Sequence, residues 1–118
     1  MLQQQEAYVE TIATEEWVDL VELYKELRRE GMQSDSFEAF HQKLYEQKNI
    51  FAFNWQKWTE GMKVLQDPAT DFSQCSLLQL SMYLTLIFRT DCFADGTIQQ
   101  CFNNGVLDKL IKRIEEIT

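Results

Sequence analysis

An apolar stretch at residues 77–88 constrains the fold of this chain more than any other feature. It reads Leu-Leu-Gln-Leu-Ser-Met-Tyr-Leu-Thr-Leu-Ile-Phe, which places apolar side chains on nearly every side of a helix. A helix of that kind is buried in a protein core or spans a membrane. These twelve residues are well short of the roughly 20 that cross a bilayer. The stretch therefore predicts a central, buried helix at about residues 76–88 and no membrane insertion.

Two segments carry the spacing of a capping box. In this motif the N-cap residue and an acid or amide three residues later bond each other's backbone N–H groups at the start of a helix. Ser76 and Gln79 have this spacing directly before the apolar stretch. Asp35 and Glu38 have it before a second segment, which we expect to be helical to about residue 48. The apolar face of that second helix comprises Phe37, Phe40, Leu44 and Tyr45.

Residues 15–30 have the periodicity of an amphipathic helix, with apolar residues three and four positions apart. Thr14 is the expected N-cap, and Gly31 is the expected stop. Residues 1–13 have a weaker helical pattern, which predicts either a short helix or a docked arm. The apolar stripe of the 15–30 helix is Trp17, Leu20, Val21, Tyr24 and Leu27.

The remaining segments predict a connector and three more helices. Residues 50–53 alternate apolar and small side chains, which indicates an extended connector or a brief strand. Asn54 is the expected cap of a helix at 55–66 that ends before Asp67-Pro68. A short helix is expected at 97–102, and Gly105 precedes a last helix that ends near Ile117. We expect an all-α fold: a single domain over residues 1–118, built as a compact bundle of five or six helices around the central one.

Cysteine usage and the N-terminal sequence predict a cytoplasmic, reduced protein. The three cysteines form no C-x-x-C pair, so no disulfide framework is implied. The first residues lack the basic region and apolar run of a signal peptide, so we expect none.

The net charge of −8 is concentrated in the N-terminal quarter of the chain, where residues 1–31 carry eight acids and three bases. A field of that sign repels phosphate backbones, which disfavours direct binding of nucleic acid. It attracts a basic protein surface, and the alternative is a face that only keeps the protein in solution. The candidate partner-binding residues are Glu15, Glu16, Asp19, Glu22, Glu26 and Glu30.

The sequence contains no recognisable catalytic or metal-binding constellation. His41 is the single histidine, so a serine-type triad is the least supported arrangement. A dyad or a zinc site that joins His41 to Cys75, Cys92 and Cys101 has no supporting spacing. No phosphate-binding loop, dinucleotide fingerprint or zinc-protease motif is present. We therefore expect no catalytic residue, metal or cofactor.

The second half of the chain carries three short motifs: Phe53-Asn-Trp55 with Trp58, the dipeptide Asp67-Pro68, and Arg89-Thr-Asp-Cys-Phe-Ala-Asp-Gly96. Through them, residues 49–117 resemble a bacterial family of unknown function, domain-of-unknown-function family 6508. The family pattern has an F-D-W…W block followed by R-x-D-R-F-x-x-G. Asn54 therefore replaces an aspartate of the pattern, and Cys92 replaces an arginine. The resemblance implies an all-α domain and transfers no activity.

Arg89, Asp91 and Asp95 lie where the apolar helix meets a glycine turn. Arginine's planar fork grips carboxylate or phosphate, so the turn is a candidate anion anchor. The structural alternative, which we favour, is that Arg89 pairs with Asp91 or with helix carbonyls and holds the turn. The nearby aromatic run from Phe51 to Trp58 predicts core packing, with one ring exposed for binding.

These features support two function hypotheses. The first, which we favour, is a non-catalytic acidic protein-interaction module. In its sharpest form it is a small inhibitor of a basic nucleic-acid-handling protein, like phage-encoded anti-defence or anti-CRISPR inhibitors. The second is a small enzyme at the Arg89–Gly96 turn, which requires a cleft lined by Arg89, Asp91 and Tyr83, with His41 as a further candidate. Under the first hypothesis we expect a protein partner with a basic surface, and we expect neither direct binding of nucleic acid nor binding to a membrane. The sequence leaves the oligomeric state open.

Overall fold

The computed structural model describes residues 12–51, 53–63, 67 and 69–118, and the regular secondary structure in these ranges is helical throughout. The all-α fold predicted from the sequence is therefore confirmed. Six α-helices and one short 3₁₀ helix are described, in the order α2 Thr14–Glu30, α3 Asp35–Glu46, η1 Trp55–Lys57, α4 Thr59–Met62, α5 Leu77–Asp91, α6 Thr97–Asn103 and α7 Val106–Ile117.

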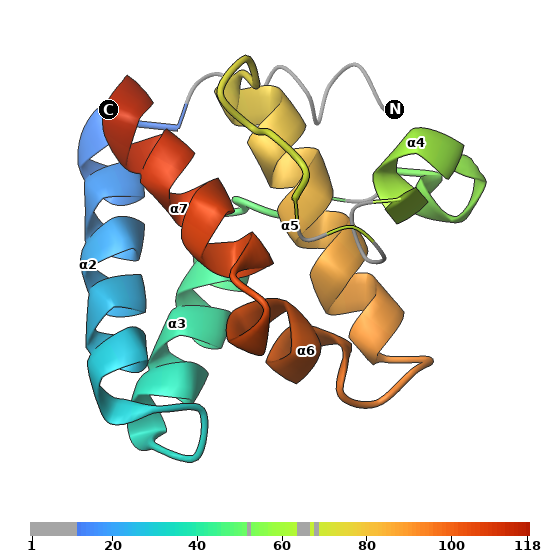
Figure 1. Ribbon diagram of the computed structural model, residues 1–118. Helices are drawn as coiled ribbons and strands as arrows, with labels where there is room; N and C mark the ends of the chain where they lie inside the picture. Colours follow the sequence, from blue (N-terminus) through green and yellow to red (C-terminus); the bar gives the residue numbers. More distant parts are fainter. Residues whose placement is uncertain (1–11, 52, 64–66, 68) are drawn as a thin grey trace.

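The helices gather around α5 and α7 (Figure 1). Helices α2 and α3 form an antiparallel pair on one side, and α7 packs against both α2 and α5. Helix α6 joins α5 to α7, while η1 and α4 pack on α5 from the other side. Helix α5 thus contacts four of the other helical elements, which gives it the central position expected of an all-round apolar helix.

Burial along α5 confirms its central role. Leu80, Leu84 and Ile87 have no exposed surface. The capping box is present, since the Gln79 amide N–H donates to Ser76 Oγ at 3.2 Å and Ser76 N–H donates to Gln79 Oε1 at 2.9 Å. The helix continues to Asp91, three residues beyond the expected end.

Two hydroxyl groups on α5 hold the connector that follows α3. Phe51 N–H donates to Thr85 Oγ1 at 3.1 Å, and Ser81 Oγ donates to the backbone carbonyl of Asn49. Described residues 50, 51 and 53 are neither helix nor strand, so the connector interpretation of this segment is correct. Two backbone polar groups of this segment are thus satisfied by side chains of α5 in place of a strand ladder.

Helix α2 has the predicted stripe, and all five stripe residues are buried. It ends at Gly31, whose φ of 92° lies in a region that side-chain-bearing residues avoid. Gly105, which precedes α7 as expected, has a similar φ of 89°.

Two expected N-caps are wrong, and the third, Asn54, is at the N-cap position but makes no side-chain cap bond. Helix α2 has Ala13 at its N-cap, so Thr14 is already its first helical residue. Helix α3 has Ser34 at its N-cap, and neither it nor Asp35 forms the predicted capping box. Ser34 Oγ instead donates to the carbonyl of Gly31 at 2.6 Å and so closes the turn between α2 and α3.

The helix expected at 55–66 is interrupted at Trp58. This residue leaves helical geometry, with φ −85° and ψ 83°, between η1 and α4. Its ring packs on Tyr83 of α5 at 4.7 Å between centroids, and Gly61 lies so close beneath it that a Cβ there would be 2.3 Å from the Trp58 ring. A tertiary contact therefore overrides the local helical pattern.

Some expectations fall on residues outside the described ranges: the arm or short helix at 1–11, Leu65 at the end of the expected 55–66 helix, and Pro68 as its stop. Within the described part, no helix is long and apolar enough to cross a membrane. Helices α6 and α7 begin and end within about one residue of the expected positions.

Candidate functional site

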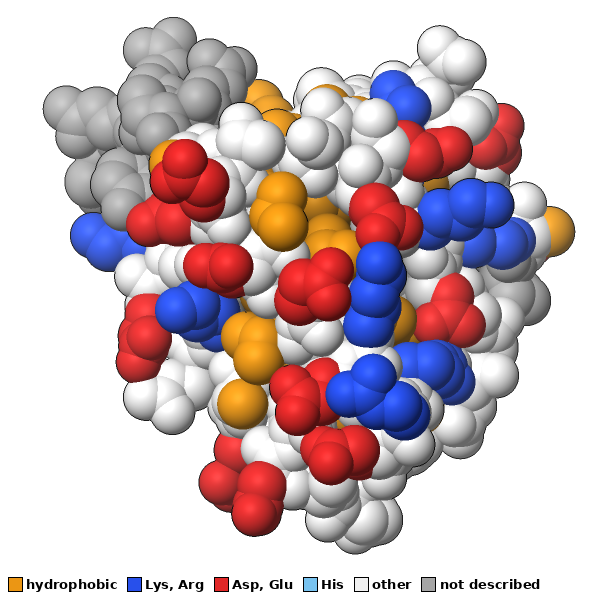
Figure 2. Space-filling model, turned by 90° about the vertical axis from the view of Figure 1, so that its left-hand side faces the viewer, with side chains coloured by type: hydrophobic (Ala, Val, Ile, Leu, Met, Phe, Trp, Pro, Cys, Tyr) orange, Lys and Arg blue, Asp and Glu red, His pale blue; other side chains and the backbone are white. Residues whose placement is uncertain are grey.

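Helix α2 presents its acidic side chains to solvent because its apolar stripe faces the core. Glu15, Asp19, Glu22, Glu26 and Glu30 are exposed, and Glu16 is half-buried. Figure 2 shows this side of the molecule, with acids spread across the middle and hydrophobic patches between them. Lys and Arg side chains gather along the right-hand edge of the same view.

Two of the three basic residues of α2 bond to α7, and the third, Arg29, is exposed. Lys25 donates to Glu115, and Arg28 bonds Asp108 through Nη2 at 2.8 Å. Arg28 Nη2 also donates to the carbonyl of Phe102 at 2.7 Å. The Tyr24 hydroxyl completes this cluster by donating to Asp108 at 2.6 Å; burial, and then this hydrogen bond, raise the Tyr24 pKa. These contacts place Lys25 and Arg28 at the edge of α2 toward α7.

The six candidate acids do not form a uniform surface. Glu22 lies 3.8 Å from the Lys25 amine, and Glu30 accepts a hydrogen bond from Ser36. Side chains of the remaining four make no ion pair or hydrogen bond with described residues: Glu15, Glu16, Asp19 and Glu26.

An apolar centre accompanies these acids. Val18 lies between Glu15 and Glu22 along the exposed side of α2 and is 40% exposed. A hollow of about 500 Å³ beside α2 is lined by both acids and cations, namely Asp19, Glu22, Glu26, Lys25, Arg29 and Lys43. The α2 face is therefore mixed, with unpaired carboxylates around a small apolar patch.

The turn that follows α5 is held by Asp91 and not by Arg89. Asp91 Oδ1 accepts the N–H groups of Gly96 at 3.2 Å and Ile98 at 3.1 Å, so it caps the start of α6 across the turn. The Arg89 side chain makes no hydrogen bond or ion pair with any residue in the described ranges; its guanidinium instead lies 5.5 Å from the Tyr45 ring centroid. The expected Arg89–Asp91 pairing is wrong, since Asp91 Oδ1 accepts backbone N–H groups and no bond to Arg89 is formed. Asp95 is exposed.

The cleft that an enzyme at this turn would need has different walls from those expected. The pocket beside Arg89 is lined by Phe53, Trp55, Gln56 and Phe93, and it includes neither Asp91 nor Tyr83. His41 lies between the rings of Phe37, Tyr45 and Phe88, with centroid distances of 5.1 to 5.6 Å. The pocket thus holds no acid or base that could transfer a proton.

Burial is the main cause of a lowered His41 pKa, and the Asp91 charge opposes it. In the described part of the chain, no group of three or more histidine, cysteine or acidic side chains could hold a metal ion. The three cysteines differ in environment: Cys92 is exposed, Cys75 is half-buried and Cys101 is buried.

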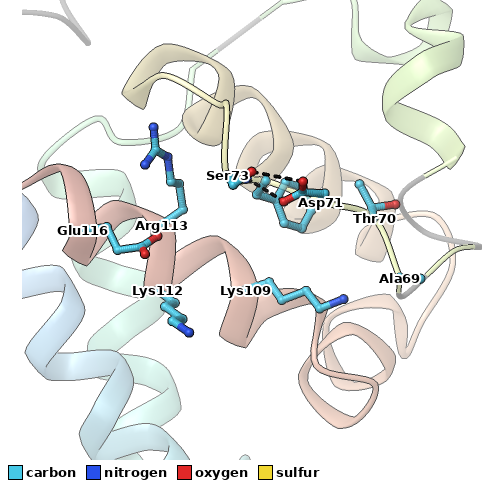
Figure 3. A pocket seen from close by; sticks show the side chains of 9 residues that line it. Ala69, Thr70, Asp71, Ser73, Lys109, Lys112, Arg113 and Glu116 are labelled. Atoms are coloured by element: carbon cyan, nitrogen blue, oxygen red, sulfur yellow. Dashed lines mark hydrogen bonds between the residues drawn. The ribbon is translucent and has the colours of Figure 1, made fainter.

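A further pocket of about 430 Å³ lies between α7 and residues 69–73 (Figure 3). Asp71 accepts the N–H and the hydroxyl of Ser73, which lowers its pKa. Lys112 and Arg113 leave α7 in opposite directions, and Arg113 donates to the carbonyl of Cys75 at 3.1 Å. Because the cations diverge and Glu116 lies among them, this pocket does not focus positive charge on one ligand.

A protein-family model matches residues 2–118, and its description is Family of unknown function (DUF6508). The chain belongs to this family. The expected match to residues 49–117 alone was too narrow, because the aromatic and glycine motifs lie in that half while α2 and α3 carry only common amphipathic patterns. No curated protein and no solved structure matches the chain. DUF6508 membership brings no known activity to any of these sites.

Proposed function

We propose that this DUF6508 protein is a non-catalytic interaction module that binds a basic protein surface through the exposed side of α2. The observation that carries the proposal is the separation of charge along that helix. Lys25 and Arg28 are held at the edge by α7, whereas Glu15, Asp19 and Glu26 are exposed and make no ion pair with described residues. Unpaired carboxylates keep their field for an incoming partner, and they speed its encounter.

The exposed Val18 supports the same surface as a contact. An interface needs an apolar centre that excludes water from the surrounding charges. Val18 is 40% exposed, and the acids flank it on the same helix. The combination suits a partner with lysine and arginine around an apolar patch.

We further propose that the partner surface normally binds nucleic acid, so that this protein acts as a competing inhibitor. Nucleic-acid-handling surfaces carry lysine and arginine to neutralise phosphates. A row of carboxylates on a rigid helix presents the same sign of charge to them. A phage-encoded inhibitor of a bacterial defence system is one protein of this type. This finer step rests on the sign of the charge.

The enzyme alternative has no specific observation in its favour. Asp91 is occupied as the cap of α6, and the pocket beside Arg89 has no general acid or base among its lining residues.

The test compares two double variants that change the net charge equally. Asp19→Asn with Glu26→Gln removes two acids from α2, whereas Asp95→Asn with Glu60→Gln removes two exposed acids from elsewhere. Wild type and both variants serve as bait in a bacterial lysate. The captured protein is then purified, and its on-rate is measured at about 0.05 M and about 0.5 M salt.

We expect the α2 variant to bind several-fold more slowly at low salt, with the control variant unchanged and the difference lost at high salt. Equal on-rates at low salt, or no salt-sensitive capture at all, would mean that the acidic side of α2 is only a solvated surface. For the inhibitor proposal, a labelled DNA duplex competes with the protein for the partner. A ternary complex would contradict competition and leave the α2 contact standing.

A further inference from the structure

A second exposed site lies beside the C-terminal end of α5. It is a pocket of about 410 Å³ lined by Phe53, Trp55, Gln56, Arg89 and Phe93. None of these residues belongs to α2 or α7, and the proposed acidic contact uses none of them. The pocket combines one cation, one amide and three aromatic rings.

Arg89 brings hydrogen-bond donors that the described part of the protein leaves unused. A guanidinium has five N–H donors. Stacking over the Tyr45 ring uses none of them, and the Arg89 side chain makes no hydrogen bond or ion pair with described residues. The nearby acid, Asp91, does not pair with it and instead accepts two backbone N–H groups. The planar fork of arginine matches a carboxylate with two parallel hydrogen bonds, so an external carboxylate fits this position.

The aromatic walls are anchored on one side and exposed on the other. Phe53 packs against Phe51, which is buried, and against Trp58, with centroids 5.2 and 5.8 Å apart. Trp55 faces Phe93 at 6.0 Å between centroids. Phe93 is 77% exposed, more than any other large hydrophobic residue described. Phe93 therefore leaves an exposed apolar ring at the rim of the pocket, where a partner could cover it.

We propose that this pocket binds a segment of a protein partner in which a carboxylate adjoins an aromatic or aliphatic side chain. Arg89 takes the carboxylate, and the apolar side chain packs on the joint surface that the Trp55 and Phe93 rings form. Gln56 lies in the same lining and supplies an amide for the segment's backbone. The charge of Arg89 selects the acid, and the rings select its neighbour.

The openness of the site favours a protein segment over a small molecule. Small-ligand pockets bury most of the ligand surface. Here one wall is Phe93, with 77% of its surface in water, so a small ligand would remain largely solvated. A protein segment carries surrounding surface that covers the exposed ring, and tryptophan and arginine are the residues enriched at the centres of protein interfaces.

The test uses two acetylated and amidated tetrapeptides, Ala-Phe-Glu-Ala and its neutral analogue Ala-Phe-Gln-Ala. Binding is followed by NMR through the Trp55 indole N–H and the Arg89 Nε–H. We expect the acidic peptide to shift both resonances with a Kd of about 1 mM or tighter. We expect the neutral analogue to bind about tenfold more weakly, since it lacks the charge-assisted pair.

Variants then assign the binding to the pocket. Arg89→Gln and Phe93→Ala should each remove the shifts, and Phe93 is exposed enough for its variant to keep the fold. Arg29→Gln, at an exposed arginine of α2, is the matched control and should bind normally.

Equal binding of both peptides, no shift up to about 10 mM, or unchanged binding by Arg89→Gln would overturn the proposal. Tighter binding of 3-phenylpropionate than of the peptide would assign the pocket to small molecules instead. All variants keep the acids of α2, so a negative result for the Arg89 pocket does not bear on the proposed α2 contact. A negative result for the α2 contact likewise does not bear on the Arg89 pocket.

Discussion

Individual cysteines of this protein lie in opposite environments. Cys92 is exposed on the turn after α5, whereas Cys101 in α6 is only 1% exposed and burial raises its pKa to about 11. The thiolate is the reactive form, so a raised pKa and low access both protect Cys101. Burial also raises the pKa of Cys75, which is half-buried.

We therefore predict that iodoacetamide at pH 8 labels Cys92 first, Cys75 more slowly and Cys101 last in the folded protein. Peptide mass spectrometry over a time course gives the order. In denaturant all three thiols should react at similar rates, which serves as the control. Early labelling of Cys101 without denaturant would show that α6 opens readily.

Thr85 is a residue whose role depends on one hydrogen bond. Its hydroxyl accepts the buried N–H of Phe51 at 3.1 Å and donates to the Ser81 carbonyl at 2.8 Å. Thr85→Val keeps the volume and leaves that N–H without an acceptor, which should cost about 1–3 kcal/mol of unfolding free energy. Thr85→Ser keeps the hydroxyl and loses a methyl group, at about 1 kcal/mol. In urea melts, Thr85→Val should therefore have a lower unfolding free energy than Thr85→Ser. The reverse order would contradict the role of the Thr85 hydroxyl as the acceptor for Phe51 N–H.

At the scale of elements, the α5–α6 turn depends on the Asp91 carboxylate. Asp91→Ala removes the acceptor for two N–H groups and should destabilise the protein by about 1 kcal/mol, the usual effect of losing a helix cap. Asp91→Asn keeps an oxygen acceptor and should lose less. Asp95→Asn on the same exposed turn is the control, expected within about 0.5 kcal/mol of wild type.

The same variant has a pH readout. The negative charge of Asp91 favours the protonated form of His41, while burial favours the neutral form. Asp91→Asn removes the favourable charge, so the His41 pKa should fall further below its ordinary value. NMR titration of the imidazole measures this shift. A rise in the His41 pKa would show that the carboxylate does not act on this ring.

At the scale of the whole molecule, Arg28 joins three helices. From α2 it bonds Asp108 of α7 and the carbonyl of Phe102 in α6, and its guanidinium lies 3.6 Å from the Phe102 ring centroid. Arg28→Lys keeps the charge and loses the planar fork, so one amine cannot make both bonds in the same geometry.

We expect Arg28→Lys to lower the unfolding free energy by about 1 kcal/mol, because the group is partly exposed and solvent screens the charge. Arg29→Lys is the matched control on the next residue and should change stability by under about 0.5 kcal/mol. Equal unfolding free energies for the two variants would mean that the Arg28 bonds contribute nothing measurable to holding α2 on α6 and α7.

Helix positions were largely predictable because they depend on neighbours in the chain. The α2 stripe, the stop at Gly31 and the capping box at Ser76 each involve residues three or four positions apart, so periodicity shows them directly. The burial of α5 followed from its lack of a polar side. Caps were less predictable where adjacent residues were both suitable, as with Ser34 and Asp35.

The candidate sites were decided by tertiary structure. The acids of α2 were visible in the sequence, but which stay unpaired depends on α7, whose Glu115 and Asp108 take Lys25 and Arg28 across more than 75 residues of chain. The pocket at Arg89 depends on η1 meeting the end of α5. Local sequence determined the helices and their polar sides, because those follow from spacing along one helix. Only packing of distant helices decided which charges and rings remain available to a partner.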